Sequence, residues 1–403
     1  MGRKFRPWKG LVAAGILVLM CSGIAFATNG MELIGIGAVQ RSMGGAGSAL
    51  PLDSFVITLN PAAMTELPAM LDLGVTFFNP ATKYEATHNA FMGPLSGTTV
   101  EKSSSYPSSF IPNLGVVYPV TDRLSLGLAA FGSAGMGVKY GDGVYGNNVF
   151  TSFEMLKVVP GLAYKISDTF SLGVALNLDR GVMGYEAAGV SDHDETACLG
   201  WGFQVGAYLR PNAQWSLSLA YISQQWFDDY EFDTAMGKDV VDLDLPQAVV
   251  FGVGYRPTER LRFAMDLKWI NWAQTMGKGK PDMPKSETPL PPFDMSWDDQ
   301  LVLALGAEYD LVPDEWKLRA GYNYGKAPLT KSRAFENIAF PALVEHHFTA
   351  GVGYSPMDNL WINLGGMYAP PVHISGSNAM QGLSDYDTSL QEYSIDLGVS
   401  YKF

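Results

Sequence analysis

The chain has 403 residues, with 27 basic and 40 acidic side chains and a formal net charge of −13. This acidic balance argues against a nucleic-acid-binding protein, because such proteins present basic surfaces. Hydrophobic residues make up 47% of the chain and 44 residues are glycine, yet beyond residue 27 no apolar run approaches the roughly 18 to 20 residues of a membrane-spanning helix.

The first 27 residues have the three parts of a secretory signal peptide. Basic residues between Arg3 and Lys9 precede an apolar run from Leu11 to Met20, and Ala25-Phe26-Ala27 forms a small-x-small cleavage site. Cys21 would permit a lipoprotein, but the large Met20 stands where a small residue is expected before a lipidated cysteine. Cleavage after Ala27 leaves Cys198 as the single cysteine, so no intrachain disulfide can form.

Residues 28–68 do not alternate between apolar and polar side chains. They contain the glycine-rich stretch Met43–Gly47 and the sequence Asn60-Pro61-Ala62, whose residue types favour turns. Apolar residues such as Leu33, Ile34 and Phe55 make the segment too hydrophobic for a solvated leader, which is the alternative interpretation. We expect this segment to be a plug inside the domain formed by residues 69–403.

From Met70 onward, apolar and polar residues alternate in repeated segments separated by turns, which is typical of β-strands. Counting the segments predicts about fourteen strands, an even number as in bacterial barrels. Short turns alternate with long loops, and aromatic residues cluster beside the short turns, as in an interfacial girdle. The predicted loops are 81–108, 136–150, 186–199, 227–240, 275–296, 326–345 and 375–390.

The last eleven residues, Tyr393–Phe403, show the alternation most regularly. Termini usually fray, so a strand this regular at the end of the chain indicates that it pairs on both sides and closes a barrel. We therefore predict an all-β fold, a transmembrane antiparallel β-barrel with the plug in its lumen. A soluble β-sandwich would not place its aromatic residues in an outward ring.

In this combination the chain resembles the FadL-type outer-membrane transporters of long-chain fatty acids and hydrocarbons. The resemblance rests on Met43-Gly44-Gly45-Ala46-Gly47, Asp53, Asn60-Pro61-Ala62, Leu243–Pro246 and the terminal phenylalanine. It implies a monomeric outer-membrane barrel of a Gram-negative bacterium, in contact with phospholipid and lipopolysaccharide. It also implies a plug motif of Gly44, Gly45, Asn60, Pro61 and Ala62, and release of a hydrophobic ligand sideways beside a kinked third strand.

The third strand departs from alternation after Phe131, where Gly132, Gly135 and Gly137 fall close together. Glycine in a strand permits a bulge or bend. Glycines that begin an outer loop would explain the same residues, and the family resemblance favours the lateral opening.

A transporter of apolar acids needs a cation in an apolar lumen, because a carboxylate buried without a partner is costly. Strand parity places four basic residues inside the barrel, and we take them as candidates for binding a substrate carboxylate: Arg262, Lys268, Arg319 and Lys157. The alternative for any one of them is an ion pair with a lumen acid such as Asp266 or Asp179, or with the plug. Arg180 breaks the parity of its strand, and Arg41 is a possible plug partner for lumen acids.

Apolar residues at inward parity indicate a hydrophobic lumen pocket. The candidates are Phe153, Met155, Met183, Trp361 and Met367. A water-filled porin would place polar residues there, although some of these side chains could simply pack on the plug.

The sequence favours neither an enzyme nor a metal protein. Asp192, His193, Asp194, Glu195 and Cys198 lack metal-ligand spacing, and no serine-hydrolase, dinucleotide-binding or zinc-protease motif occurs. We expect no catalytic residues, no metal and no cofactor. The alternatives are a general diffusion porin for small polar solutes and, more distantly, an outer-membrane lipid hydrolase.

Overall fold

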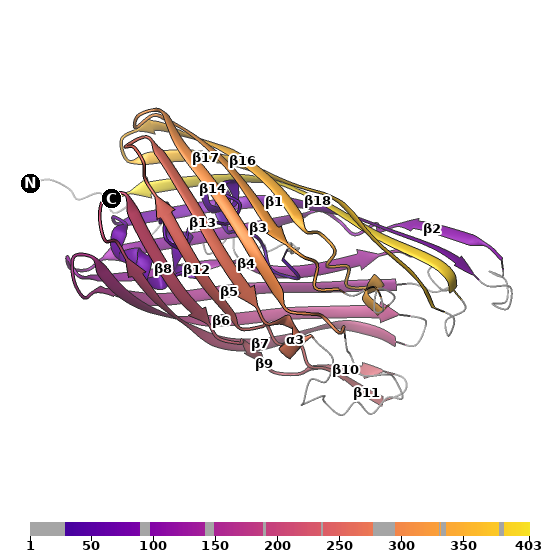
Figure 1. Ribbon diagram of the computed structural model, residues 1–403. Helices are drawn as coiled ribbons and strands as arrows, with labels where there is room; N and C mark the ends of the chain where they lie inside the picture. Colours follow the sequence, from indigo (N-terminus) through magenta and orange to yellow (C-terminus); the bar gives the residue numbers. More distant parts are fainter. Residues whose placement is uncertain are drawn as a thin grey trace, which may run out of the picture.

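The computed structural model of the chain is a β-barrel (Figure 1). It describes residues 29–88, 97–141, 149–187, 191–234, 237–276, 295–329, 331, 336–378 and 383–403. The predicted signal peptide lies outside these residues. Sixteen strands form one sheet, in which β2 and β9 are short additions. The other fourteen form a closed antiparallel ring, because the last strand pairs with the first along its whole length. This confirms the predicted barrel.

The wall strands, in chain order, are β1 (Met70–His88), β3 (Ser109–Pro119), β4 (Leu124–Lys139), β5 (Val149–Lys165), β6 (Phe170–Ala187), β7 (Ser191–Leu209), β8 (Trp215–Ile222), β12 (Ala248–Tyr255), β13 (Leu261–Ile270), β14 (Gln300–Val312), β15 (Trp316–Gly325), β16 (His346–Met357), β17 (Leu360–Asn378) and β18 (Leu383–Lys402). The short strands are β2 (Thr99–Ser103), β9 (Trp226–Phe227), β10 (Tyr230–Thr234) and β11 (Gly237–Val241). The helical elements are α2 (Gly37–Ser42), α3 (Trp272–Thr275) and the 3₁₀ turns η1 (Ser54–Thr58), η2 (Pro61–Glu66) and η5 (Glu336–Ile338).

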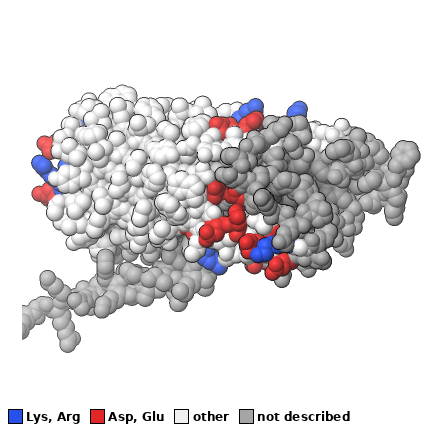
Figure 2. Space-filling model, turned by 90° about the horizontal axis from the view of Figure 1, so that it is seen from below, with Lys and Arg blue, Asp and Glu red and all other residues white. Residues whose placement is uncertain are grey.

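The wall follows the alternation in the sequence. On β6, Leu176 and Leu178 point outward and are 50% and 47% exposed, whereas Asn177 between them is 0% exposed. Figure 2 shows the result, a broad surface band without acidic or basic residues, with charged groups at one end of the molecule and again beyond the other side of the band. No helix among the described residues is long and apolar enough to cross a membrane.

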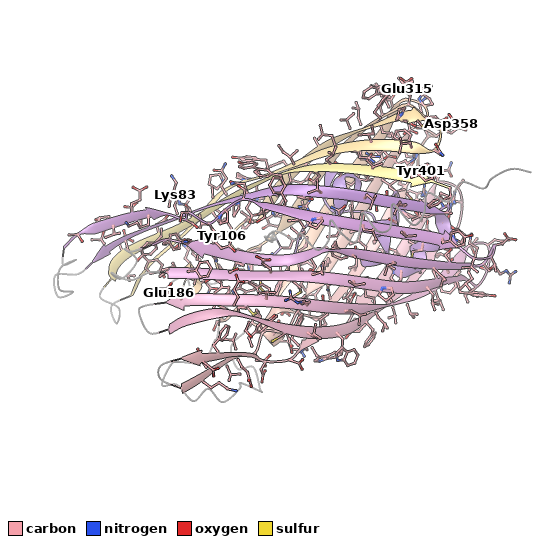
Figure 3. The ribbon with its side chains drawn as sticks, turned by 180° about the vertical axis from the view of Figure 1, so that it is seen from behind. Lys83, Tyr106, Glu186, Glu315, Asp358 and Tyr401 are labelled. Carbon is pink, nitrogen blue, oxygen red and sulfur yellow. The ribbon has the colours of Figure 1, made fainter. Side chains whose placement is uncertain are left out.

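The two ends of the barrel differ. Short turns join β3–β4, β5–β6, β7–β8, β12–β13, β14–β15 and β16–β17 at one end, where Figure 3 places Glu315 and Asp358. Aromatic rings pair across strands beside these turns, with centroid distances of 4.2 Å for Trp215 and Tyr255 and 4.5 Å for Trp316 and Tyr354. The predicted girdle at this end is therefore present.

The strands at the other end are longer than the sequence analysis predicts. Much of the predicted loop 186–199 is strand, because β6 runs to Ala187 and β7 starts at Ser191. The loop predicted at 375–390 shrinks in the same way, since β17 ends at Asn378 and β18 starts at Leu383. Lys83 and Glu186, at this end in Figure 3, lie on strands that continue beyond the apolar band. Outward-facing residues there are polar, so these strand ends lack the apolar–polar alternation by which the other strands were predicted.

The N-terminal segment (residues 29–69) lies within the ring of strands, where Figure 1 shows its helical turns in indigo. The helix α2 contacts β1 and β15 to β18, whereas η1 and η2 contact β3 to β7. Most of its residues are buried, including polar ones such as Arg41 and Asn60. The segment therefore spans the lumen from one side of the wall to the other.

Candidate functional site

Three inward carboxylates of the wall bind the N-terminal segment. Asp72 on β1 accepts hydrogen bonds from the backbone N–H and hydroxyl of Ser54. Asp266 on β13 accepts from Gly47 N at 2.9 Å and from both N–H and hydroxyl of Ser48. Asp396 on β18 pairs with Arg41, with Nε and Oδ1 2.9 Å apart and both side chains 1% exposed. The segment is thus fixed at three separate points.

Wall glycines let the backbone of the segment approach the strands closely. A Cβ atom on Gly321 would lie 2.1 Å from Gly44 N, and one on Gly173 would lie 2.4 Å from Ala62 N. The same holds for Gly206 beside Asn60 and Gly351 beside Ser42, each 2.0 Å from a side-chain oxygen. Distances this short exclude any side chain, so the inner face of the wall fits this segment closely.

The predicted plug motif has a structural explanation. Asn60 caps η2, accepting from Ala62 N at 3.0 Å and donating through Nδ2 to Ala207 O on β7 at 3.0 Å. Pro61 occupies the first position of the turn, where its fixed φ fits and no N–H is needed. Gly44 and Gly45 follow α2 with φ of 67° and 82°, values that favour glycine.

Asp53 caps η1 in a similar way, since its Oδ1 accepts from Phe55 N at 3.1 Å. Burial and, to a smaller extent, the neighbouring Asp72 carboxylate raise the pKa of Asp53 well above its usual value. Both capping residues thus belong to turns that are packed against the wall.

The third wall strand, β4, loses its neighbour part way along. It pairs with β3 only from Ser125 to Phe131, and its register with β5 shifts between Gly132 and Ala134. In the part of β3 that no longer pairs with β4, residues Ser109 to Pro112 continue to pair with β1. Beyond Phe131, therefore, the hydrogen-bonded ladder between β3 and β4 stops at the place where the sequence has its three glycines.

The N-terminal segment covers this free edge of β4 from inside. Glu32 forms an isolated bridge with Ala134, and Gly135 N donates to Met31 O at 3.4 Å. Higher up, the ring of Tyr106 lies against Gly137, where a Cβ atom would be 2.5 Å from Cζ. The free edge is thus covered by side chains and by residues 31–33 rather than by a wall strand.

A lumen cavity lies between the N-terminal segment and the wall. Its apolar lining includes Leu33, Ile34, Phe131, Ile222 and Leu245, and Ser133 at the β4 bulge also lines it. Lys157 on β5 and Lys268 on β13 line the same cavity. The carboxylates of Glu32 and Asp266 and several amide side chains line it too, so the cavity combines apolar and polar surface, two cations and contact with the bulge.

Both cavity lysines have partners. Lys268 Nζ pairs with the Glu32 carboxylate, and Lys157 Nζ lies 3.4 Å from Asp179 Oδ1 and donates to Gln225 Oε1. Glu32 thus links Lys268, on the opposite wall, to the residues that cover the β4 edge.

The two predicted arginines lie in another cluster, outside the lining of this cavity. Arg262 pairs with Glu308 at 2.6 Å and Asp310 at 2.8 Å, and Arg319 Nε lies 2.8 Å from Glu308 Oε2. The registers put this cluster near the short turns, because Glu308 lies opposite both arginines and Asp310 adjoins the β14–β15 turn. Ion pairing inside the wall accounts for both residues.

Four of the five predicted apolar residues come together. Phe153, Met155, Met183 and Met367 belong to one large buried apolar cluster, which also contains Met136 of the β4 bulge. Trp361 is buried elsewhere, and Lys317 Nζ lies 5.1 Å from its ring centroid. None of the five lines the lumen cavity, so their role as a binding pocket stays a prediction. Arg180 is exposed, as its parity indicates.

The sequence analysis missed Glu32 and Gln225, the partners of the two lysines. Glu32 lies 236 residues from Lys268 in a segment without periodicity, and Gln225 lies just before the predicted loop 227–240. The wall glycines could have been found, since many of them stand at inward parity on their strands.

Comparison with known proteins agrees with this architecture. Residues 18–403 match the family model described as outer membrane protein transport protein (OMPP1/FadL/TodX). Outer membrane protein P1 of Haemophilus influenzae is 22% identical over 422 aligned positions, covering 87% of this chain and 89% of that protein. Two crystal structures share the fold. A Pseudomonas aeruginosa FadL homologue has a TM-score of 0.75 at 17% identity and covers 93% of this chain and 100% of its own. The P. putida toluene transporter TodX has a TM-score of 0.71 at 19% identity, with coverages of 92% and 99%.

Proposed function

Since the chain belongs to the OMPP1/FadL/TodX family of outer-membrane transport proteins, we propose that it carries long-chain fatty acids into the cell by lateral release into the bilayer. The family places the protein in the outer membrane of a Gram-negative bacterium as a β-barrel transporter of hydrophobic compounds. What the proposal adds is the substrate class, the site and the route. We also propose that it acts as a monomer in contact with lipopolysaccharide.

The observation that carries the proposal is the pair of lysines that line the lumen cavity beside its apolar residues. An alkane makes no use of a buried cation and an aromatic hydrocarbon does not need one, whereas a carboxylate in an apolar site requires one. Lys268 is the better placed of the two, because its partner Glu32 belongs to the N-terminal segment rather than to the wall. A fatty acid carboxylate would take the place of Glu32 at Lys268.

We propose that the exit lies at the β4 bulge, between the end of the β3–β4 ladder and Tyr106. The cavity reaches the bulge at Phe131 and Ser133, and residues 31–33 cover the free β4 edge. Because Glu32 links Lys268 to this edge, a carboxylate that displaces Glu32 would also weaken the cover over the exit. The N-terminal segment would then act as the plug, with residues 31–33 as its moving part.

The competing functions make different demands. A general porin needs an open lumen, whereas the N-terminal segment here crosses it and contacts strands on both sides. A lipid hydrolase needs an activated nucleophile, and the family and its structural neighbours are transport channels. An aromatic hydrocarbon substrate, as for the toluene transporter with the same fold, is the closest alternative, and it would leave both lysines in their ion pairs with Glu32 and Asp179.

The test is binding of a fluorescent long-chain fatty acid to the purified protein in detergent. Lys268→Met should weaken binding about 10-fold to 100-fold, the factor that corresponds to losing one hydrogen bond to a charged group. Lys157→Met should have a smaller effect, because Asp179 and Gln225 on the wall already engage Lys157.

Lys238→Met is the matched control, since that lysine pairs with Glu231 in the exposed β10–β11 hairpin. Equal binding of the fatty acid by wild type and Lys268→Met, together with tight toluene binding by both, would replace the fatty acid by an aromatic hydrocarbon as the substrate.

A further inference from the structure

The carboxyl group of Glu392 is buried in the lumen without a full set of hydrogen-bond partners. Glu392 lies at inward parity on β18, is 1% exposed and stands opposite Ala369 of β17 and Pro80 of β1. Among the residues that the structure describes, none forms a hydrogen bond with its Oε2 atom. A buried carboxyl oxygen without a donor is costly, so its position requires an explanation.

Glu392 lines a small cavity at the β4 bulge. The lining includes Gly135, Met136 and Gly137 of β4, Gly30 of the N-terminal segment and Leu390. Apart from Glu392 and Thr82, the side chains around this cavity are apolar. The cavity is thus a second pocket on the inner side of the free β4 edge, separate from the one lined by Lys157 and Lys268.

The charges nearby do not supply the missing donor. Arg41 attracts Glu392 electrostatically, but its Nε lies 2.9 Å from Asp396 Oδ1 and its Nη1 forms no hydrogen bond with Glu392. Because no lysine or arginine lines this cavity, it offers no cation to an ionised carboxylate head group. A neutral group that donates an O–H hydrogen bond suits it well.

We propose that Glu392 forms an exit subsite that accepts a hydrogen bond from the hydroxyl of a neutral substrate head group, that of a protonated fatty acid or a long-chain alcohol. This inference rests on the proposed route past the β4 bulge. The apolar chain would lie along Met136 and Leu390 while the head group faces Glu392. The subsite favours the uncharged form, which is the form that hydrocarbon accepts at lower cost.

The experiment compares two neutral probes of equal length, radiolabelled hexadecanol and hexadecane. Uptake is measured at one pH in Gram-negative cells that lack their own transporters of hydrophobic compounds and that produce wild type, Glu392→Leu or Glu392→Gln. Lys238→Met, in the exposed β10–β11 hairpin and outside the lining of this cavity, is the control. Heat-modified migration of the barrel on gels confirms that each variant is folded.

Glu392→Leu should lower hexadecanol uptake about fivefold, the factor for one neutral hydrogen bond of about 1 kcal/mol, and leave hexadecane uptake unchanged. Glu392→Gln keeps an acceptor oxygen and should retain hexadecanol uptake, as should Lys238→Met. Equal loss of both probes in Glu392→Leu, or no loss of either, would overturn the inference and leave the cavity as a site for water only. If wild type accelerates neither probe, the route itself is refuted, and the inference with it.

Discussion

The buried ion pair between Arg41 and Asp396 should decide whether the N-terminal segment stays in the lumen. Arg41 lies on α2 and Asp396 on the closing strand β18, so this pair joins the segment to the seam of the barrel. Arg41→Met removes the cation while keeping a long apolar side chain. We expect this variant to form a barrel whose N-terminal segment is released.

The size of the expected loss of stability follows from the burial of the Arg41–Asp396 pair. Both side chains are 1% exposed and lie 2.9 Å apart, so the change leaves Asp396 with only hydroxyl partners, Thr76 at 2.5 Å and Ser394 at 3.3 Å. Removing one member of a buried pair costs about 3–5 kcal/mol. That loss is large for a segment that binds the wall at three main points. The exposed pair of Lys238 and Glu231 should contribute at most about 1 kcal/mol.

Two measurements test this expectation. Urea titration in phospholipid vesicles reports the free energy of unfolding, and ion conductance in planar bilayers reports whether the lumen has opened. Arg41→Met should be destabilised and should conduct more than wild type, whereas Lys238→Met should match wild type in both. The double variant Arg41→Met with Asp396→Asn should recover most of the stability, because no unpaired charge remains buried.

The recovery in the double variant is the decisive result. If Arg41→Met unfolds and conducts like wild type, the pair does not fix the segment. If the double variant is as unstable as the single one, the loss comes from packing around Arg41 rather than from the uncompensated Asp396 carboxylate.

Three further changes test other parts of the site. Gly135→Leu should lower uptake of fatty acid while the barrel remains folded, since it fills the free edge of β4, and unchanged uptake would remove this edge from the route. Asn60→Ala should reduce the free energy of unfolding by about 0.5–2 kcal/mol through loss of the η2 cap, which urea titration measures against wild type. Gly321→Val should displace Gly44 and raise bilayer conductance, whereas Gly366→Ala, whose Cβ would meet nothing closer than 3.5 Å, should behave as wild type.

The fold was predictable because lipid imposes a strict pattern on the wall. Between Leu261 and Trp269, the alternation placed Arg262, Asp266 and Lys268 inside, and the structure has all three there. The apolar–polar alternation is lost where both faces of a strand lie in polar surroundings. The ends of β6, β7, β17 and β18 were therefore predicted as loops. Strand parity thus gives the direction of a side chain within the membrane and less beyond it.

The partners of the inward charges were not predictable from parity. Lys268 and Trp361 both point inward as expected, but one faces the lumen cavity and the other lies near Lys317. Their heights depend on the tilt of each strand and on where the N-terminal segment sits. Neither the tilt of a strand nor the position of the N-terminal segment produces a periodic pattern in the sequence.

The closure of β18 on β1 has a consequence for assembly. Met70 pairs with Lys402, so the ring cannot close before the whole chain is available, and this contact has the longest loop-closure cost in the wall. In the closed ring the helix α2 contacts both β1 and β18. Closing the β1–β18 seam therefore also completes the surface on which the N-terminal segment packs.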